Sequence, residues 1–345
     1  MKRKALVLLA GLTCMLSGCS GIGSSNTLVN VSYDPTRELY EAYNELFTAY
    51  WEEETGETIR IIQSHGGSGK QALEVANGLP ADVVTLALEG DVDSIRDAEL
   101  IDPGYVEEFP SDSAPYTSSI VFLVRAGNPK EINDWSDLLR EDVGVITPNP
   151  KTSGGARWNY LAAWYSFERE GLSEEEIIEA MRSLYQNVVV LDSGARGSTT
   201  SFVENGQGDV LIAWENEAFL SLEERPGEFE IVIPSASILC QPTVAVVDAV
   251  VYEHSTEETA AAYLNYLYSE EAQKLIGENF YRPVDQETAL QFTRKGSERT
   301  LTEIPEDGRW LVDTVDLTDI TYFGGWDAAN EKHFTDGALF DQLYE

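Results

Sequence analysis

The chain has 345 residues, of which 43% are hydrophobic, enough for the cores of two domains rather than a disordered chain or one small module. It carries 60 acidic residues against 23 basic ones, a formal net charge of -37. The electric field of this negative charge repels the phosphates of nucleic acids and anionic membrane surfaces, so we expect no nucleic-acid partner.

The N-terminus is typical of an exported protein. Three basic residues precede the apolar run Ala5–Leu16, which is too short to span a bilayer but fits a secretory signal. The run ends in Leu-Ser-Gly-Cys at residues 16–19, which resembles the bacterial lipobox, where signal peptidase cuts before an acylated cysteine. We predict a signal peptide over 1–18, lipidation at Cys19, and a flexible tether that completes residues 19–27.

From Leu28 onward, short β-branched runs alternate with longer segments of helical period. The first strand is expected over 28–32, followed by a helix that Asp34 and Pro35 begin and that stops near Gly56. A second strand over 59–63 leads through a small-residue turn into a helix that ends near Gly78. This alternation predicts an α/β chain with largely parallel sheets.

The same strand-turn-helix unit occurs twice more. A strand over 143–147 precedes a helix that opens at Ser153, Gly154 and Gly155, and a strand over 188–191 precedes a helix that starts near Ser198. Between them, the sequence Ser-Glu-Glu-Glu at 173–176 predicts a capping box for another helix.

Four turns of this kind suggest a ligand site. A helix N-terminus offers unpaired N–H donors, and glycine or serine there allows a ligand to approach the backbone closely. In open α/β sheets these turns lie at the carboxyl ends of the strands, where ligands bind, so turns from two domains could meet on one small anion. The alternative is that each turn only caps its helix, because capping uses the same residue types.

Motifs for other chemistry are incomplete. A P-loop would need glycine where Ser64 stands and a hydroxyl residue where Gln71 stands, and Lys70 breaks the nucleophile-elbow pattern. The histidines at 65, 254 and 333 have no partners at metal-ligand spacing, so we expect no metal and no cofactor. Cys240 stands in an apolar stretch and is expected to be buried rather than reactive.

Several long segments closely resemble the sulfate-binding proteins of bacterial ABC importers. These segments are 32–38, 63–71, 149–158, 208–217, 280–283 and 323–326. The resemblance implies a two-lobed periplasmic binding protein fold of type II, with a mainly parallel sheet and flanking helices in each lobe and the ligand in the cleft. It places residues 28–112 plus 236–290 in lobe 1, 113–235 in lobe 2, and 291–345 in a C-terminal tail that packs on the lobes.

The resemblance also implies which groups bind the ion. The backbone donors would be the N–H groups of Asp34, Ser68, Gly154, Gly155 and Ala195. The hydroxyls of Ser68 and Ser153 and the indole N–H of Trp214 would add side-chain donors. His65, Arg157 and Arg196 would stand behind these turns and fix their geometry without touching the ion.

The implied function is that of a receptor without catalysis. We expect an exported monomer, anchored at the periplasmic face or cell surface through lipid on Cys19 alone, that captures sulfate and delivers it to ABC permease subunits. Thiosulfate, molybdate or tungstate remain alternative ligands. A secreted sulfatase or phosphatase is the alternative from another class, and it would need a nucleophile with a base or a metal cluster.

Overall fold

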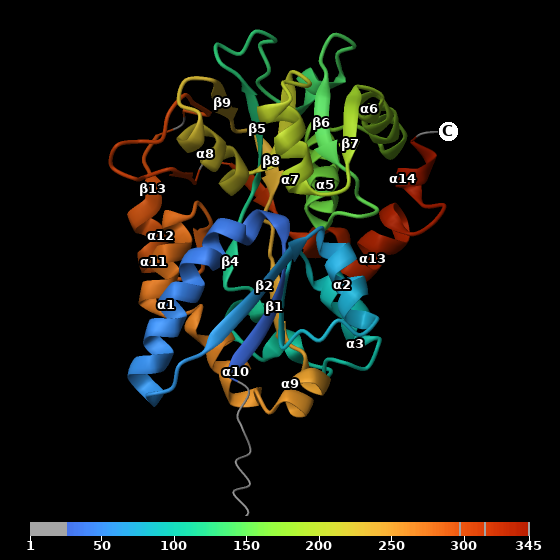
Figure 1. Cartoon of the computed structure of the whole chain (residues 1–345). Coiled ribbons are helices and arrows are strands. Elements are labelled where there is room, and N and C mark those ends of the chain that lie inside the picture. Colours follow the sequence, from blue (N-terminus) through green and yellow to red (C-terminus); the bar gives the residue numbers. More distant parts are fainter. Residues whose placement is uncertain (1–25, 297, 314, 344–345) are drawn as a thin grey trace, which may run out of the picture.

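Two β-sheets lie in separate halves of the molecule, which we call lobe 1 and lobe 2 (Figure 1). In the described residues, the lobe 1 sheet has the strand order β11-β3-β1-β2, and the lobe 2 sheet has the order β14-β9-β5-β8-β6-β7. Helices flank both sheets, with lobe 2 above lobe 1 in Figure 1. The predicted α/β, two-lobed architecture is confirmed.

The structure is a computed structural model and describes residues 26–296, 298–313 and 315–343. The predicted signal peptide, Cys19 and most of the predicted tether lie outside these residues. Within the described ranges, no helix combines the length and the apolar character that crossing a membrane requires.

Lobe 1 is formed largely by the first hundred residues of the described chain. Strand β1 is parallel to both β2 and β3, whereas β11 joins the sheet antiparallel to β3 after the chain has passed through lobe 2. The strands are β1 (Thr27–Tyr33), β2 (Arg60–Gly66), β3 (Val83–Leu86) and β11 (Thr243–Val246). The helices are α1 (Arg37–Thr55), α2 (Ser68–Ala76), α3 (Glu89–Arg96), α4 (Pro110–Ser113), α9 (Asp248–His254), α10 (Glu257–Tyr266) and α11 (Glu270–Glu278).

Helix α1 illustrates how sequence pattern becomes structure. Leu39, Tyr43 and Phe47 recur at helical spacing and are fully buried against the core. The helix ends at Gly56, whose positive φ of 73° suits glycine at a helix C-terminus, as predicted. Asp34 differs from the prediction, because it lies inside a 3-10 turn (Asp34–Thr36) that precedes α1 and its side chain caps no helix.

Lobe 2 contains the other two predicted strand-turn-helix units. Ser153 and Ser173 cap α5 and α6 through their side chains, and the predicted capping box of Ser173 with Glu176 is confirmed. The strands are β5 (Ile120–Arg125), β6 (Val145–Pro148), β7 (Val188–Asp192), β8 (Val210–Trp214), β9 (Phe229–Val232) and β14 (Thr300–Leu301). The helices are α5 (Gly154–Arg169), α6 (Glu174–Gln186), α7 (Ala195–Thr199) and α8 (Glu215–Glu224), with a 3-10 turn over Trp135–Leu139 and a π-helical turn over Thr200–Glu204.

The sheet of lobe 2 is mixed, whereas the sequence predicted mainly parallel sheets. Strand β6 is parallel to β7 and β8, but β5 is antiparallel to both β8 and β9, and β14 is antiparallel to β9. The reason is topological, because β5 carries the chain into lobe 2 and β9 carries it back, so these neighbours must run in opposite directions. The helix predicted to start near Ser198 begins three residues earlier, at Ala195.

Short strands connect the lobes. Strand β4 (Tyr116–Thr117) pairs with β12 (Arg282–Pro283), and Ser118 forms a β-bridge with Cys240. Strand β10 (Ala236–Ile238) pairs with β16 (Asp316–Thr318). Cys240 is fully buried, as predicted, and burial raises the pKa of its thiol, which disfavours the reactive thiolate.

The C-terminal segment contacts both lobes, since the Trp310 indole donates to the Gly277 carbonyl of α11 in lobe 1 at 3.0 Å. Trp326 contacts Trp158 with ring centroids 4.7 Å apart, and the Lys151 ammonium donates to the Phe334 carbonyl at 2.9 Å.

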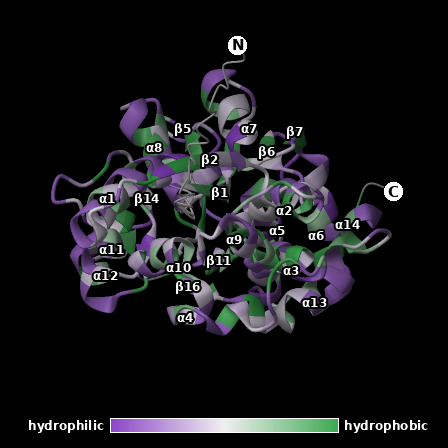
Figure 2. Ribbon diagram, turned by 60° about the horizontal axis from the view of Figure 1, so that its bottom comes forward, coloured by the Kyte–Doolittle hydropathy of each residue, from purple (hydrophilic) through white to green (hydrophobic). Residues whose placement is uncertain are grey.

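Hydrophilic residues cover much of the outer helices, and hydrophobic residues follow the central strands (Figure 2). The remaining elements are α12 (Gln286–Phe292), β13 (Thr293–Arg294), β15 (Leu311–Val312), α13 (Gly325–Ala329) and α14 (Leu339–Gln342), with a 3-10 turn over Ile320–Phe323 and a π-helical turn over Asn330–Phe334.

Candidate anion-binding cleft

The five predicted backbone donors all stand at the start of a helix. Asp34, Ser68, Gly154 and Ala195 occupy the first position of their helices, and Gly155 occupies the second position of α5. No carbonyl of the same helix can accept from an N–H at these positions. The sequence therefore leaves these amides available to a ligand, two in lobe 1 and three in lobe 2.

These turns meet in one pocket between the lobes, which we call the cleft pocket. Its walls come from both lobes. Its lining residues are Tyr33, Asp34, Pro35, Gly66, Gly67, Ser68, Ser153, Gly155 and Ala195. Gly154 is next to the pocket but faces Asp91 and Leu88 instead of lining it. Among the described residues that line the pocket there is no lysine or arginine.

The lobes are closed over this pocket. A Cβ added to Gly67 of lobe 1 would lie 2.9 Å from the Thr152 carbonyl oxygen of lobe 2, closer than side chains tolerate. The Trp158 indole donates across the cleft to the Ala87 carbonyl at 2.8 Å, and the Asn216 amide donates to the Pro35 carbonyl at 3.0 Å. A ligand in the cleft pocket is thus surrounded by groups of both lobes.

The two serines differ in what their hydroxyls can offer. The Ser153 Oγ accepts from the Ala156 N–H at 3.3 Å, which leaves its hydrogen free to donate into the cleft pocket. The Ser68 Oγ accepts from the Ala87 N–H at 3.0 Å. Burial raises the pKa of the Asp91 carboxyl, and a hydrogen bond with the Ser68 hydroxyl lowers that pKa in part. The Ser153 hydroxyl is therefore the better placed of the two to donate to a ligand, whereas Ser68 would offer chiefly its amide.

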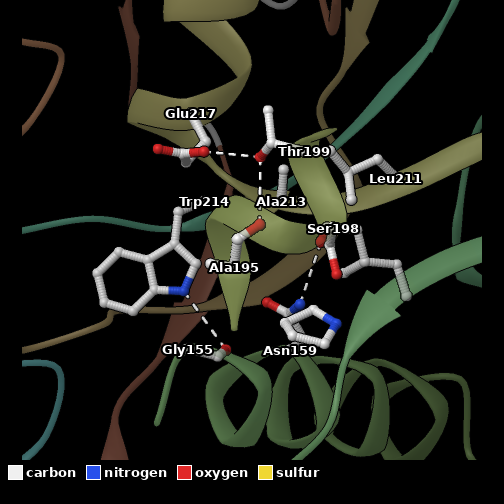
Figure 3. Close-up of a pocket in the computed structure, with 11 residues that line it drawn as sticks. Gly155, Asn159, Ala195, Ser198, Thr199, Leu211, Ala213, Trp214 and Glu217 are labelled. Atoms are coloured by element: carbon white, nitrogen blue, oxygen red, sulfur yellow. Dashed lines mark hydrogen bonds between the residues drawn. The ribbon is translucent and has the colours of Figure 1, made fainter. Parts of the chain in front are cut away.

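Trp214 lines a second pocket, which we call the inner pocket (Figure 3). The inner pocket shares Gly155 and Ala195 with the cleft pocket. The Trp214 indole N–H donates to the Gly155 carbonyl at 3.4 Å, a long and weak hydrogen bond. A ligand oxygen nearby would offer this N–H a better acceptor.

The supporting role of His65, Arg157 and Arg196 stays a prediction, and the structure shows which groups surround their side chains. The Arg157 Nε donates to the Pro150 carbonyl at 3.0 Å, and its Nη1 lies 3.7 Å from the Asp91 carboxylate of lobe 1. The Arg196 Nη2 donates to both oxygens of Glu38 at 2.7 Å. Burial, with the charge of nearby Arg37, lowers the pKa of His65 to about 4, so its ring is neutral near pH 7.

Sequence reasoning missed several wall residues. Gly67 was part of a recognised turn, but only the structure places it against the opposite lobe. Glu217 is 2% exposed and lines the inner pocket, although a glutamate on a helix is ordinarily solvated. Asn159 and Ser198 line the same pocket, and nothing in their local sequence distinguishes them from core residues.

The chemistry of the cleft is that of binding. Backbone N–H groups and a hydroxyl lie at the cleft pocket, and the Trp214 indole lies in the adjoining inner pocket, an arrangement suited to a compact group that carries only acceptors. In the ranges that the structure describes, no three His, Cys, Asp or Glu side chains are placed to hold a metal ion. The fold and the cleft together define the chain as a two-lobed solute-binding protein.

Comparison with known proteins gives the family. Residues 36–282 match the family of bacterial extracellular solute-binding proteins. The chain is 53% identical over 335 residues to a sulfate-binding protein of Escherichia coli K12, covering 96% of this chain and 97% of the relative. It is 42% identical to a thiosulfate-binding protein of Pseudomonas aeruginosa, covering 100% of this chain and 99% of the relative.

A solved structure agrees with these sequence relatives. The sulfate-binding protein SubI from Mycobacterium tuberculosis H37Rv superposes with a TM-score of 0.76 at 31% identity, covering 89% of this chain and 99% of that one. The chain belongs to the bacterial extracellular solute-binding protein family, within the group that contains these sulfate- and thiosulfate-binding proteins. It is an exported binding protein of a transport system and not an enzyme.

Proposed function

We propose that this chain captures sulfate in the cleft pocket and delivers it to the permease of an ABC importer. The observation that supports the proposal is the meeting of four helix-start residues from both lobes, Asp34, Ser68, Gly155 and Ala195, in the cleft pocket, with Gly154 next to it. The relatives named for sulfate support the choice of ion. Asp34, Ser68, Gly154, Gly155 and Ala195 would supply backbone donors, and Ser153 and Trp214 would supply side-chain donors.

The donor set suits sulfate better than phosphate. Sulfate near neutral pH is a dianion that carries only acceptors, whereas monoprotonated phosphate brings a hydroxyl that needs an acceptor of its own. A net charge of -37 does not prevent binding, because charges more than about 8 Å away are screened at physiological salt while the local amides are not.

Thiosulfate is the second candidate. The inner pocket adjoins the cleft pocket through Gly155 and Ala195, and its walls include Pro148 and Ala213, which suit a bulkier and less polar terminal atom. The relative named for thiosulfate, at 42% identity, points the same way.

Titration calorimetry of the purified chain with sulfate, thiosulfate, molybdate and phosphate tests the proposal. We expect sulfate to bind at least about tenfold more tightly than phosphate, because an unpaired buried hydroxyl costs about 1–3 kcal/mol. Phosphate that displaces sulfate at comparable concentration would contradict a pocket built only of donors.

Neutral donors should carry the binding energy. A hydrogen bond to a charged group contributes about 1.5–3 kcal/mol, so Ser153→Ala and Trp214→Phe should each weaken sulfate binding about ten- to a hundredfold. Arg37, an exposed cation at the start of α1, is the control, and Arg37→Gln should change the Kd less than about threefold. A larger effect of Arg37→Gln than of Ser153→Ala would mean that salt bridges hold the ion.

We further propose that lipid on Cys19 anchors the exported protein. The support is the lipobox-like sequence at residues 16–19. Wild-type protein should partition with membranes and carry acyl mass on Cys19, whereas Cys19→Ala should not. Wild-type protein that fractionates as freely soluble and lacks acyl mass would refute the anchor.

A further inference from the structure

Glu217 is a buried carboxylate in the wall of the inner pocket, where a negative charge opposes anion binding. It stands in the first turn of α8, and 2% of its surface is exposed. Figure 3 shows its side chain beside Thr199, with Trp214 and Ala195 close by. Two of these neighbours, Trp214 and Ala195, are proposed to donate to the ion.

One carboxylate oxygen of Glu217 is attached to the donor turn of α7. The Thr199 hydroxyl donates to the Glu217 Oε2 at 2.6 Å and also lies 3.3 Å from the Ala195 carbonyl (Figure 3). Thr199 is the last residue of α7, and Ala195 is the first. This contact fixes α7 against the start of α8, which directly follows Trp214.

The other carboxylate oxygen of Glu217 lies near Arg196, which also contacts lobe 1. The Glu217 Oε1 has no hydrogen-bond partner within the described part of the chain, and it lies 3.4 Å from the Arg196 Nη2. The same nitrogen donates to both oxygens of Glu38 on α1 of lobe 1. One guanidinium of α7 is therefore shared between the pocket wall of lobe 2 and a carboxylate of lobe 1.

This sharing makes the position of α7 depend on lobe closure. While the lobes are closed, Glu38 and Glu217 pull Arg196 from two sides, and α7 is held between them. Separation of the lobes would carry Glu38 away with α1 and would leave Arg196 to Glu217. Burial raises the pKa of Glu217 above its ordinary value, Arg196 and the Thr199 hydroxyl lower it in part, and Glu38 and Asp34 raise it further, so Arg196 and Thr199 both favour the ionised carboxylate.

We propose that Glu217 is a positioning residue that aligns the Ala195 amide with the ion and, through Arg196 and Glu38, couples this alignment to closure of the lobes. The role rests on the proposed function, since it concerns the same bound anion. Glu217 makes no contact with the ion itself. It acts through Thr199 and Arg196 alone.

A double-mutant cycle between the lobes tests this role. Glu217→Gln should raise the sulfate Kd about tenfold, mostly through faster dissociation in stopped-flow measurements, and Glu38→Gln should raise it about fivefold. The double variant should be no weaker than about tenfold, because both changes interrupt one connection. Glu223→Gln, at an exposed position of the same helix, is the control and should leave the Kd unchanged.

Thermal unfolding without ligand separates positioning from a structural role. Glu217→Gln removes a buried charge at constant size, so its Tm should stay within a few degrees of the wild type. Thr199→Val removes the hydroxyl that donates to the Glu217 Oε2, and it should weaken sulfate binding as Glu217→Gln does. Additive effects in the cycle, or unchanged Kd values in both Glu217→Gln and Thr199→Val, would overturn the role while sulfate binding stands. A wild-type chain that binds no sulfate would instead overturn the proposed function, and this role with it.

Discussion

Gly67→Ala should weaken sulfate binding about five- to a hundredfold without destabilising the unliganded protein. A methyl group at Gly67 would lie 2.9 Å from the Thr152 carbonyl oxygen and 3.3 Å from the Ser193 carbonyl oxygen, both of which belong to the backbone of the opposite lobe. Forcing such a contact costs about 1–3 kcal/mol or more, and this cost falls only on the closed, ligand-bound arrangement.

The backbone at Gly67 does not itself require glycine. Its φ of -59° and ψ of 130° are open to alanine, so the substitution introduces no strain in the separated lobes. Calorimetric titration with sulfate and thermal unfolding without it would measure the two effects. Gly69→Ala is the matched control, because a Cβ there meets its nearest atom at 3.5 Å, an ordinary contact distance. Equal affinity of the Gly67→Ala and wild-type proteins would show that closure at this point is not needed for binding.

Arg282→Met should lower the free energy of unfolding by about 3–5 kcal/mol. The Arg282 guanidinium donates to both oxygens of Glu215 at 2.7 and 2.8 Å, and the two residues are 8% and 2% exposed. Removing the arginine leaves a buried carboxylate without its partner. Because Glu215 directly follows Trp214 and Arg282 lies in the strands between the lobes, sulfate affinity should fall as well.

Urea denaturation monitored by circular dichroism would measure this loss. The double variant Glu215→Gln/Arg282→Met should recover part of the stability, because it removes the uncompensated charge together with its partner. A loss below about 1 kcal/mol in Arg282→Met would mean that Glu215 finds water or other partners once the arginine is gone.

The sequence alone was enough to predict the elements that form the cleft. Helical spacing in α1, the capping serines at 153 and 173, and the small-residue turns before α2, α5 and α7 are local signals, set by backbone geometry and helix-end hydrogen bonding. These signals act within a few residues, so they do not depend on the rest of the fold.

Only the tertiary structure decided how these elements meet. The antiparallel placement of β5 in lobe 2, the approach of Gly67 to Thr152, and the burial of Glu217 have no local signature. Glu38 and Arg196 are 158 positions apart in the chain, and Glu215 and Arg282 are 67 apart. Such pairs form only when folding brings both partners together. Each charge then loses part of its hydration, and its partner offsets that cost, so the interaction depends on the assembled lobes rather than on either segment.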